Sequence, residues 1–160
     1  MSRLLKACAI ALVGAVTAMA FSTTAQAAPS AAPNSVSSAI VTPLSAPAGC
    51  PSGDFCVWTL PNGGGTRCLA TPKSSSYWGA NCANRDRTLY NNGINDPNGY
   101  NNVRIYWGSN HTGAWACLHR GTYWLSADEA SFNFGGTGAP GWGEYLTNDA
   151  ASHKWATTCS

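Results

Sequence analysis

The titratable side chains of this chain do not form a recognisable catalytic set. Its three histidines, His111, His119 and His153, are scattered, and neither the HExxH motif of metalloproteases nor the GxSxG motif of hydrolases occurs. Among the carboxylates only Asp128 and Glu129 are adjacent, and adjacent side chains on a strand point to opposite faces. The sequence therefore predicts a protein that is not an enzyme and needs no cofactor.

Cysteines are the other residues with chemical potential. Cys8 lies at the start of an apolar N-terminal run, and six more follow it: Cys50, Cys56, Cys68, Cys82, Cys117 and Cys159. No CxxC pair is present, which argues against a zinc site. We expect Cys8 to be removed with the N-terminal signal. The remaining six are an even number in a small exported chain, which predicts three disulfides, although spacing alone does not select their pairing.

The N-terminus has the three parts of a secretory signal. Arg3 and Lys6 are basic, residues 7–20 form an apolar run that is short for a membrane span, and Ala25-Gln26-Ala27 places small residues where a signal peptidase reads them. We expect cleavage after Ala27, so that residues 1–27 are a signal peptide and the protein is secreted.

The remaining chain divides into a linker and a folded domain. Residues 28–49 are rich in Ala, Pro and Ser and lack charge and aromatic rings, which predicts a disordered linker or pro-segment. Residues 50–160 contain every tryptophan and form the predicted domain. Nine basic residues minus the two of the signal leave seven against seven acidic ones. This balance argues against nucleic acid as a partner, and no further apolar run could cross a membrane.

The domain has the pattern of an all-β fold. Short aromatic and β-branched runs are cut by Gly, Asn and Pro, and residues 103–107 alternate as a half-buried strand does. A single helical turn is expected at residues 126–130, where Ser126 and Glu129 can form a capping box.

An internal repeat organises these strands. Residues 58–65 followed by Cys68-Leu69 match residues 106–113 followed by Cys117-Leu118, and two later pairs keep the same order: Tyr77-Trp78 with Tyr123-Trp124, and Asn84 to Thr88 with Asn148 to Ser152. We expect two copies of one β unit. Each copy would have a buried aromatic residue, a glycine with positive φ at a hairpin and a hydroxyl residue bonded to that turn: Trp58, Gly65 and Thr88, then Tyr106, Gly113 and Ser152.

This combination resembles the βγ-crystallin Greek-key motif. With the opening Cys50-Pro51-Ser52-Gly53-Asp54-Phe55-Cys56-Val57-Trp58 and with Val103-Arg104-Ile105-Tyr106 before the second turn, it is similar to the crystallin-like Streptomyces metalloproteinase inhibitors, family thirty-six of the peptidase inhibitors. The resemblance extends to about Trp155. It implies a disulfide-stapled sandwich of two Greek keys and a secreted inhibitor of extracellular metallopeptidases of the thermolysin type. We expect a monomer.

An inhibitor of this kind needs a rigid extended segment that enters the enzyme cleft. Thermolysin-like enzymes favour a large apolar residue just after the scissile bond, and two Cys-Leu steps offer one: Cys68-Leu69 and Cys117-Leu118. We predict Cys117 and Leu118 as the reactive segment, flanked by Trp115 and His119. The alternative is that both leucines are strand core.

The repeat also suggests the pairing of two disulfides, and its sequence can be compared with the calcium-binding crystallin motif. Pairing Cys68 with Cys82 and Cys117 with Cys159 would keep each bridge within its own copy. Calcium-binding crystallin motifs need two Asn or Asp residues before the hydroxyl residue, but the first copy has Arg85 at the second place, where a guanidinium would repel the cation. The second copy leaves Asn148, Asp149 and Ser152 as a weak calcium candidate, and we expect no metal.

Two other functions remain open. Seven tryptophans in a small domain could stack on sugars, so a carbohydrate- or cell-wall-binding module is one alternative, with Trp142 as the best exposed ring and Trp58, Tyr106 and Trp124 as core. A crystallin-like killer toxin is the other.

Overall fold

The computed structural model describes residues 45–160. The predicted signal peptide and residues 28–44 of the predicted linker lie outside the described residues, so the boundaries of both stay predictions. Within residues 45–160 no helix is both long and apolar enough to cross a bilayer.

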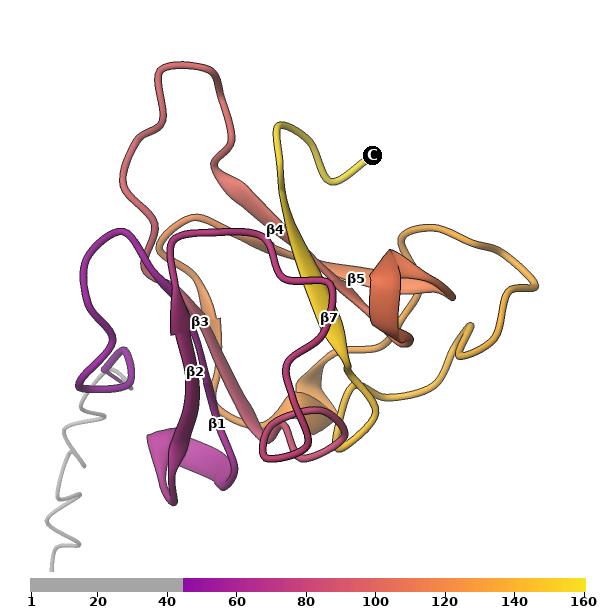
Figure 1. Ribbon diagram of the computed structural model, residues 1–160, viewed down its shortest axis with the longest axis horizontal. Coiled ribbons are helices and arrows are strands. Elements are labelled where there is room, and N and C mark those ends of the chain that lie inside the picture. The colour runs from indigo at the N-terminus through magenta and orange to yellow at the C-terminus, as the bar shows by residue number, and fades with distance from the viewer. Residues whose placement is uncertain (1–44) are drawn as a thin grey trace, which may run out of the picture. The chain divides into compact units, whose positions relative to one another are not determined.

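Two antiparallel sheets make up the domain (Figure 1). The first has the strand order β2-β1-β3-β6 and the second β5-β4-β7. Their bounds are β1 Phe55–Trp58, β2 Arg67–Thr71, β3 Thr88–Asn91, β4 Asn102–Tyr106, β5 Trp115–His119, β6 Tyr123–Trp124 and β7 Ser152–Ala156. Three short 3-10 turns join them, η1 Pro61–Gly63, η2 Ser109–His111 and η3 Ala127–Glu129. The all-β prediction is confirmed, and η3 has the expected capping box of Ser126 and Glu129.

The repeat in the sequence is a repeat in structure. In each copy an antiparallel hairpin, β1-η1-β2 or β4-η2-β5, is followed by a strand that pairs with its first member, β3 or β7. Trp58 lies opposite Thr88, and Tyr106 lies opposite Ser152. Asn62 and Asn110 have nearly the same left-handed conformation at the two turns, with φ of 57° and 56°. The two copies therefore share strand order and the register of the first strand against β3 or β7. The hairpin register differs, because a bulge between Val57 and Trp58 shifts the pairing of β1 with β2.

Each copy also contributes to the sheet of the other. Strand β6 belongs to the second copy but pairs with β3 in the first sheet, with Leu89 opposite Trp124. The matching stretch of the first copy reaches the second sheet, where Ser75 forms a bridge with His153 and the Trp78 amide donates to the Ala151 carbonyl at 2.9 Å. This exchange interlocks the two units as a βγ-crystallin-like sandwich of two Greek keys, as the resemblance implied.

The core lies between the inner faces of the two sheets. Val103 and Ile105 of β4 are fully buried, as the alternation predicted, and they belong to one cluster with Phe55, Leu89 and Phe132. Aliphatic and aromatic side chains in such a cluster each contribute about 1.5–3 kcal/mol when fully removed from water.

Three disulfides staple the domain. They join Cys50 to Cys56, Cys68 to Cys82, and Cys117 to Cys159. The second and third stay within their own copies, and the third attaches β5 to the C-terminal segment.

Candidate functional site

The two turns are tied down by matching hydroxyl groups. Thr88 Oγ1 donates to the Leu60 carbonyl at 2.9 Å and accepts from the Gly63 amide at 3.1 Å. In the second copy Ser152 makes the equivalent bonds, to the Gly108 carbonyl at 2.5 Å and from the His111 amide at 3.2 Å. Both hydroxyl residues are fully buried, so each closes its hairpin from inside the fold.

The glycines and rings of the repeat lie at these same turns. Gly65 and Gly113 have φ of 68° and 78°, a region that favours residues without Cβ. Trp58 and Tyr106 are both buried, and the Tyr106 ring lies 5.3 Å from that of His111 in the turn. These residues stabilise the hairpins and offer no group for binding.

The predicted reactive segment is not displayed on the surface. Leu118 is only 2 % exposed, and its side chain belongs to the core cluster. It lies opposite Val103 in the β4–β5 ladder, and Cys117 beside it is also buried. A protease subsite could take this leucine only if β5 left the sheet. The prediction for Cys117 and Leu118 is therefore corrected: Leu118 is strand core, which was the stated alternative.

The three residues of the weak calcium candidate lie in different surroundings. Asn148 lines a pocket that contains two arginines, whereas Asp149 lines a different pocket. The Ser152 hydroxyl is buried and bonded to its turn. Within residues 45–160 no three His, Cys, Asp or Glu side chains converge to hold a metal ion. The calcium candidate therefore stays a prediction.

The surface feature that the sequence analysis missed is the loop between β3 and β4, residues 92–101. Figure 1 shows it projecting beyond the strands that it connects. Ile94, near its start, is 64 % exposed, and Tyr100 is also exposed. A sequence signal existed: an isolated isoleucine stands in a run of turn-forming Asn, Gly and Pro residues.

The base of this loop is closed by one buried side chain. Asn91 Nδ2 lies within hydrogen-bond distance of the Asn101 and Leu118 carbonyls, at 3.1 and 3.0 Å, and its Oδ1 accepts from the Gly93 amide at 3.1 Å. Gly93 packs on Trp155 so closely that a Cβ there would lie 2.8 Å from the ring. The first residues of the loop are thereby held against the body of the domain.

The tip is tied by its own polar groups. The Asp96 amide donates to Asn101 Oδ1 at 2.9 Å, and Asp96 Oδ1 accepts from the Asn98 amide at 2.7 Å. The Gly99 amide also donates to the Asp96 carbonyl at 2.9 Å. The loop is therefore both exposed and internally hydrogen-bonded.

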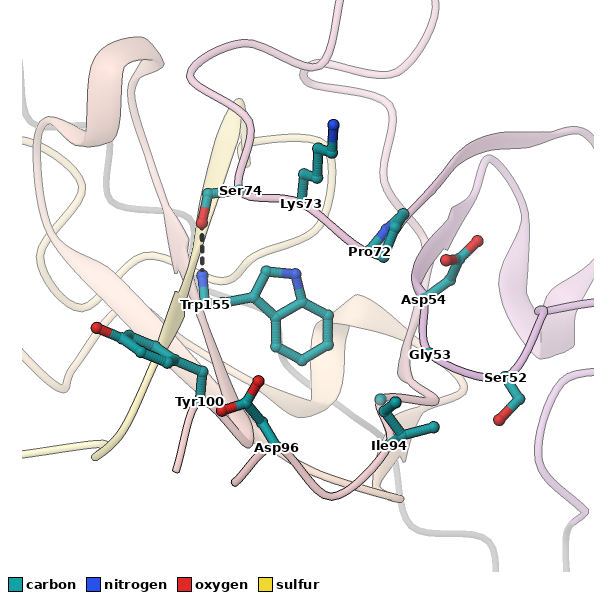
Figure 2. A pocket seen from close by; sticks show the side chains of 11 residues that line it. Ser52, Gly53, Asp54, Pro72, Lys73, Ser74, Ile94, Asp96, Tyr100 and Trp155 are labelled. Atoms are coloured by element: carbon teal, nitrogen blue, oxygen red, sulfur yellow. Dashed lines mark hydrogen bonds between the residues drawn. The ribbon is translucent and has the colours of Figure 1, made fainter. Parts of the chain in front are cut away.

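A pocket of about 650 Å³ lies beside this loop (Figure 2). The Trp155 indole lies across its middle, with Ile94 and Asp96 of the loop on one side and Pro72 on the other. The Trp155 amide donates to Ser74 Oγ at 3.0 Å, which joins β7 to the segment after β2. Loop and pocket together form a concave edge next to an exposed aliphatic side chain.

The most strongly perturbed titratable groups lie away from this edge. Burial lowers the pKa of His153 to about 3 and raises the pKa of Asp86 to about 8. Both side chains are fully buried and hydrogen-bonded to core elements. They act on stability and do not form a reactive centre.

Comparison with known proteins finds one family model that is similar to the first part of the domain. The family model "Inhibitor_I36: Peptidase inhibitor family I36" matches residues 45–118. No curated protein matches the chain. By its description, that family consists of peptidase inhibitors.

Solved structures of βγ-crystallins are similar to the chain. A βγ-crystallin from an archaeon is 16 % identical with a TM-score of 0.45, over 64 % of this chain and 96 % of its own. One from Ciona intestinalis is 12 % identical with a TM-score of 0.44, over 64 % and 99 %. A structure described under the evolution of the eye-lens βγ-crystallin domain fold is 11 % identical with a TM-score of 0.47, over 69 % and 92 %.

Proposed function

Residues 45–118 have the sequence features of peptidase inhibitor family I36, and from this match we propose that the protein is an exported, monomeric inhibitor of extracellular metallopeptidases of the thermolysin type. The family match is the observation that carries the proposal. Three disulfides within residues 45–160 support an oxidising destination outside the cytoplasm.

The segment that enters the enzyme is, in this proposal, the loop of residues 92–101. Ile94 supplies the large exposed aliphatic residue that thermolysin-like enzymes favour after a scissile bond, which makes Gly93–Ile94 the bond presented. Burying an aliphatic side chain of this size contributes about 1.5–3 kcal/mol.

The hydrogen bonds of the loop favour inhibition. Asn91 holds its base and Asp96 holds its tip, so less conformational entropy is lost on binding than for a free peptide. If the enzyme cuts the loop, the same bonds retain both ends on the domain. The adjacent pocket around Trp155 offers room for a side chain of the enzyme's rim.

The test is inhibition of a panel of metallo- and serine peptidases by the purified, oxidised protein. We expect a tight stoichiometric complex with a thermolysin-like enzyme and no effect on serine peptidases. Ile94→Asp should weaken inhibition by roughly tenfold or more, because about 1.4 kcal/mol corresponds to a factor of ten.

Leu60→Asp is the matched control, since Leu60 is an aliphatic residue 55 % exposed at the separate β1–β2 turn. Equal losses for the two variants would exclude the loop as the contact. Failure to inhibit any peptidase in the panel would overturn the proposed function.

A second candidate function rests on exposed rings. Trp142 is 38 % exposed, and Phe134 and Tyr145 of the same segment are also exposed. Such rings stack on sugars, which would suit a carbohydrate- or cell-wall-binding module. Co-sedimentation with chitin and peptidoglycan, before and after Trp142→Ala, separates this function from inhibition.

A further inference from the structure

The two copies of the repeat clasp each other through reciprocal hydrogen bonds. The Asn84 amide donates to the Ala150 carbonyl at 2.8 Å, and the Asn148 amide donates to the Asp86 carbonyl at 3.1 Å. Asn84 matches Asn148 in the repeat, and Asp86 matches Ala150. The two loops are therefore related by an internal pseudo-twofold.

A pocket lies on each side of this clasp, and the two pockets are equivalent. One is lined by Thr59, Arg85 and Asn148, and the other by their counterparts in the repeat, Trp107, Asp149 and Asn84. The molecule therefore contains the same pocket position twice, lined by different side chains.

The two pockets differ in the sign of their charge. Arg85 stands in the first where Asp149 stands in the second. Arg67 of β2 also lines the first pocket, and no carboxylate does. Two guanidinium groups thus line the first pocket, whereas a carboxylate lines the second.

Neither of these arginines is neutralised within the described part of the chain. The ion pair present there joins Arg87 to Asp128 at 3.6 Å and involves neither Arg67 nor Arg85. Both side chains are exposed. Two unpaired guanidinium groups beside one pocket repel each other unless an anion lies between them.

A disulfide links the two backbone segments that carry the arginines. Arg67 precedes Cys68, the Arg85 amide donates to the Cys82 carbonyl at 3.1 Å, and Cys68 and Cys82 form a disulfide. The backbone beneath both guanidinium groups is therefore fixed before any ligand arrives, which lowers the entropic cost of binding.

The remaining lining completes a set of neutral polar groups. Two threonine hydroxyls and two asparagine amides surround the arginines, namely Thr59, Thr66, Asn81 and Asn148. The pocket is about 580 Å³ and open to solvent, so a phosphate can enter with a group attached to it.

We propose that this pocket binds a phosphate group, free or as an ester, between Arg67 and Arg85. Planar guanidinium groups match the oxygens of a phosphate in paired hydrogen bonds. The hydroxyl and amide groups would bond its remaining oxygens. This site is separate from the loop proposed to enter the peptidase and does not depend on that function.

The test is an NMR titration of the oxidised protein with inorganic phosphate, at constant ionic strength maintained with chloride. We expect saturable shift changes at the Arg67, Arg85 and Asn148 amides. Arg85→Asp, which places here the residue type of the equivalent pocket, should weaken binding more than tenfold, and Arg85→Gln should weaken it less. Arg120→Asp makes the same charge change at an exposed arginine outside the pocket and should leave binding unchanged.

Further titrants distinguish the sources of the anion. Tighter binding of glycerol phosphate or of a soluble phosphodiester polymer than of inorganic phosphate would support an esterified ligand, and the reverse would support the free ion. Acetate binding as tightly as phosphate, shifts no larger than those with chloride, or equal losses for Arg85→Asp and Arg120→Asp would each overturn the proposal.

Discussion

At the scale of single residues, His153 is the buried group whose chemistry is best defined. Trp78 Nε1 donates to its Nδ1 at 2.8 Å, so the ring proton lies on Nε2, which donates to the Lys73 carbonyl at 2.9 Å. Protonation would break the bond from Trp78 and bury a charge. Desolvation is accordingly the largest cause that lowers the pKa of His153 to about 3.

Asp86 has the opposite dependence on pH. Its Oδ1 accepts from the Ala150 amide at 3.1 Å, whereas its buried Oδ2 has no partner among the described residues. Desolvation is the largest cause that raises the pKa of Asp86 to about 8. The native protein therefore binds this proton well above the pH at which the unfolded chain does.

The two groups predict opposing slopes of stability against pH. A depressed pKa makes His153 contribute stability above its unfolded value of 6.5, and this is lost as pH falls towards 3. A raised pKa makes Asp86 contribute stability at low pH, and this is lost as pH rises from 3.8 through 8. Between pH 6.5 and 4.5 the two contributions oppose each other. Asp86→Asn should leave only the contribution of His153, so that the free energy of unfolding falls by about 2–3 kcal/mol as pH is lowered from 6.5 to 4.5.

Urea unfolding at several pH values measures this prediction. His153→Gln should show the reverse, a gain in stability as pH is lowered from 6.5 to 4.5. His119→Gln, at an exposed histidine, controls for the loss of an imidazole. Slopes that are the same in the wild type and in Asp86→Asn would contradict it.

At the scale of elements, the connection between β3 and β4 depends on a side chain outside it. Asn91 ends β3, is fully buried and bonds the loop at both Gly93 and Asn101. It also reaches the Leu118 carbonyl of β5 in the other sheet. One amide thus joins the two sheets and closes the loop.

Asn91→Ala should therefore cost about 1–3 kcal/mol, because it leaves two carbonyls and one amide without their partner. We also expect faster hydrogen exchange at the Gly93 amide and weaker peptidase inhibition. Asn91→Asp keeps an acceptor for Gly93 but loses both donated bonds, so its exchange at Gly93 should increase less. Unchanged exchange at Gly93 in Asn91→Ala would show that the loop is held by other contacts.

At the scale of the whole domain, the exchange of segments makes the two copies interdependent. The first sheet is completed by β6 of the second copy, and the second sheet receives Ser75 from the first. Without its counterpart, each sheet would expose one face of apolar side chains to water.

We predict that residues 45–101 alone do not fold, even with Cys50–Cys56 and Cys68–Cys82 formed. The isolated half would expose Phe55, Val57 and Leu89. Poor NMR dispersion and the absence of cooperative unfolding are the expected readouts, with structure regained when residues 102–160 are added. A cooperative transition in the half alone would contradict the interlocked architecture.

The sequence by itself determined the fold class, the repeat and the turn chemistry, because these depend on local spacing. A ring, an Asn and a Gly at fixed intervals specify the same hairpin twice, and alternation along residues 103–107 specifies which side chains face the core. Even the one-turn η3 follows from Ser126 and Glu129.

Only the tertiary structure decided which residues meet. Leu118 and the neighbouring strand residues alternate in direction, and the second sheet places Leu118 inside, which no local pattern distinguishes from an exposed reactive site. Asn148 and Asp149 are adjacent in the chain but line different pockets. Arg67 and Arg85 are distant in the chain but line the same one. Neighbouring side chains diverge and distant ones converge because the packing of the two copies, and not their local spacing, sets these contacts.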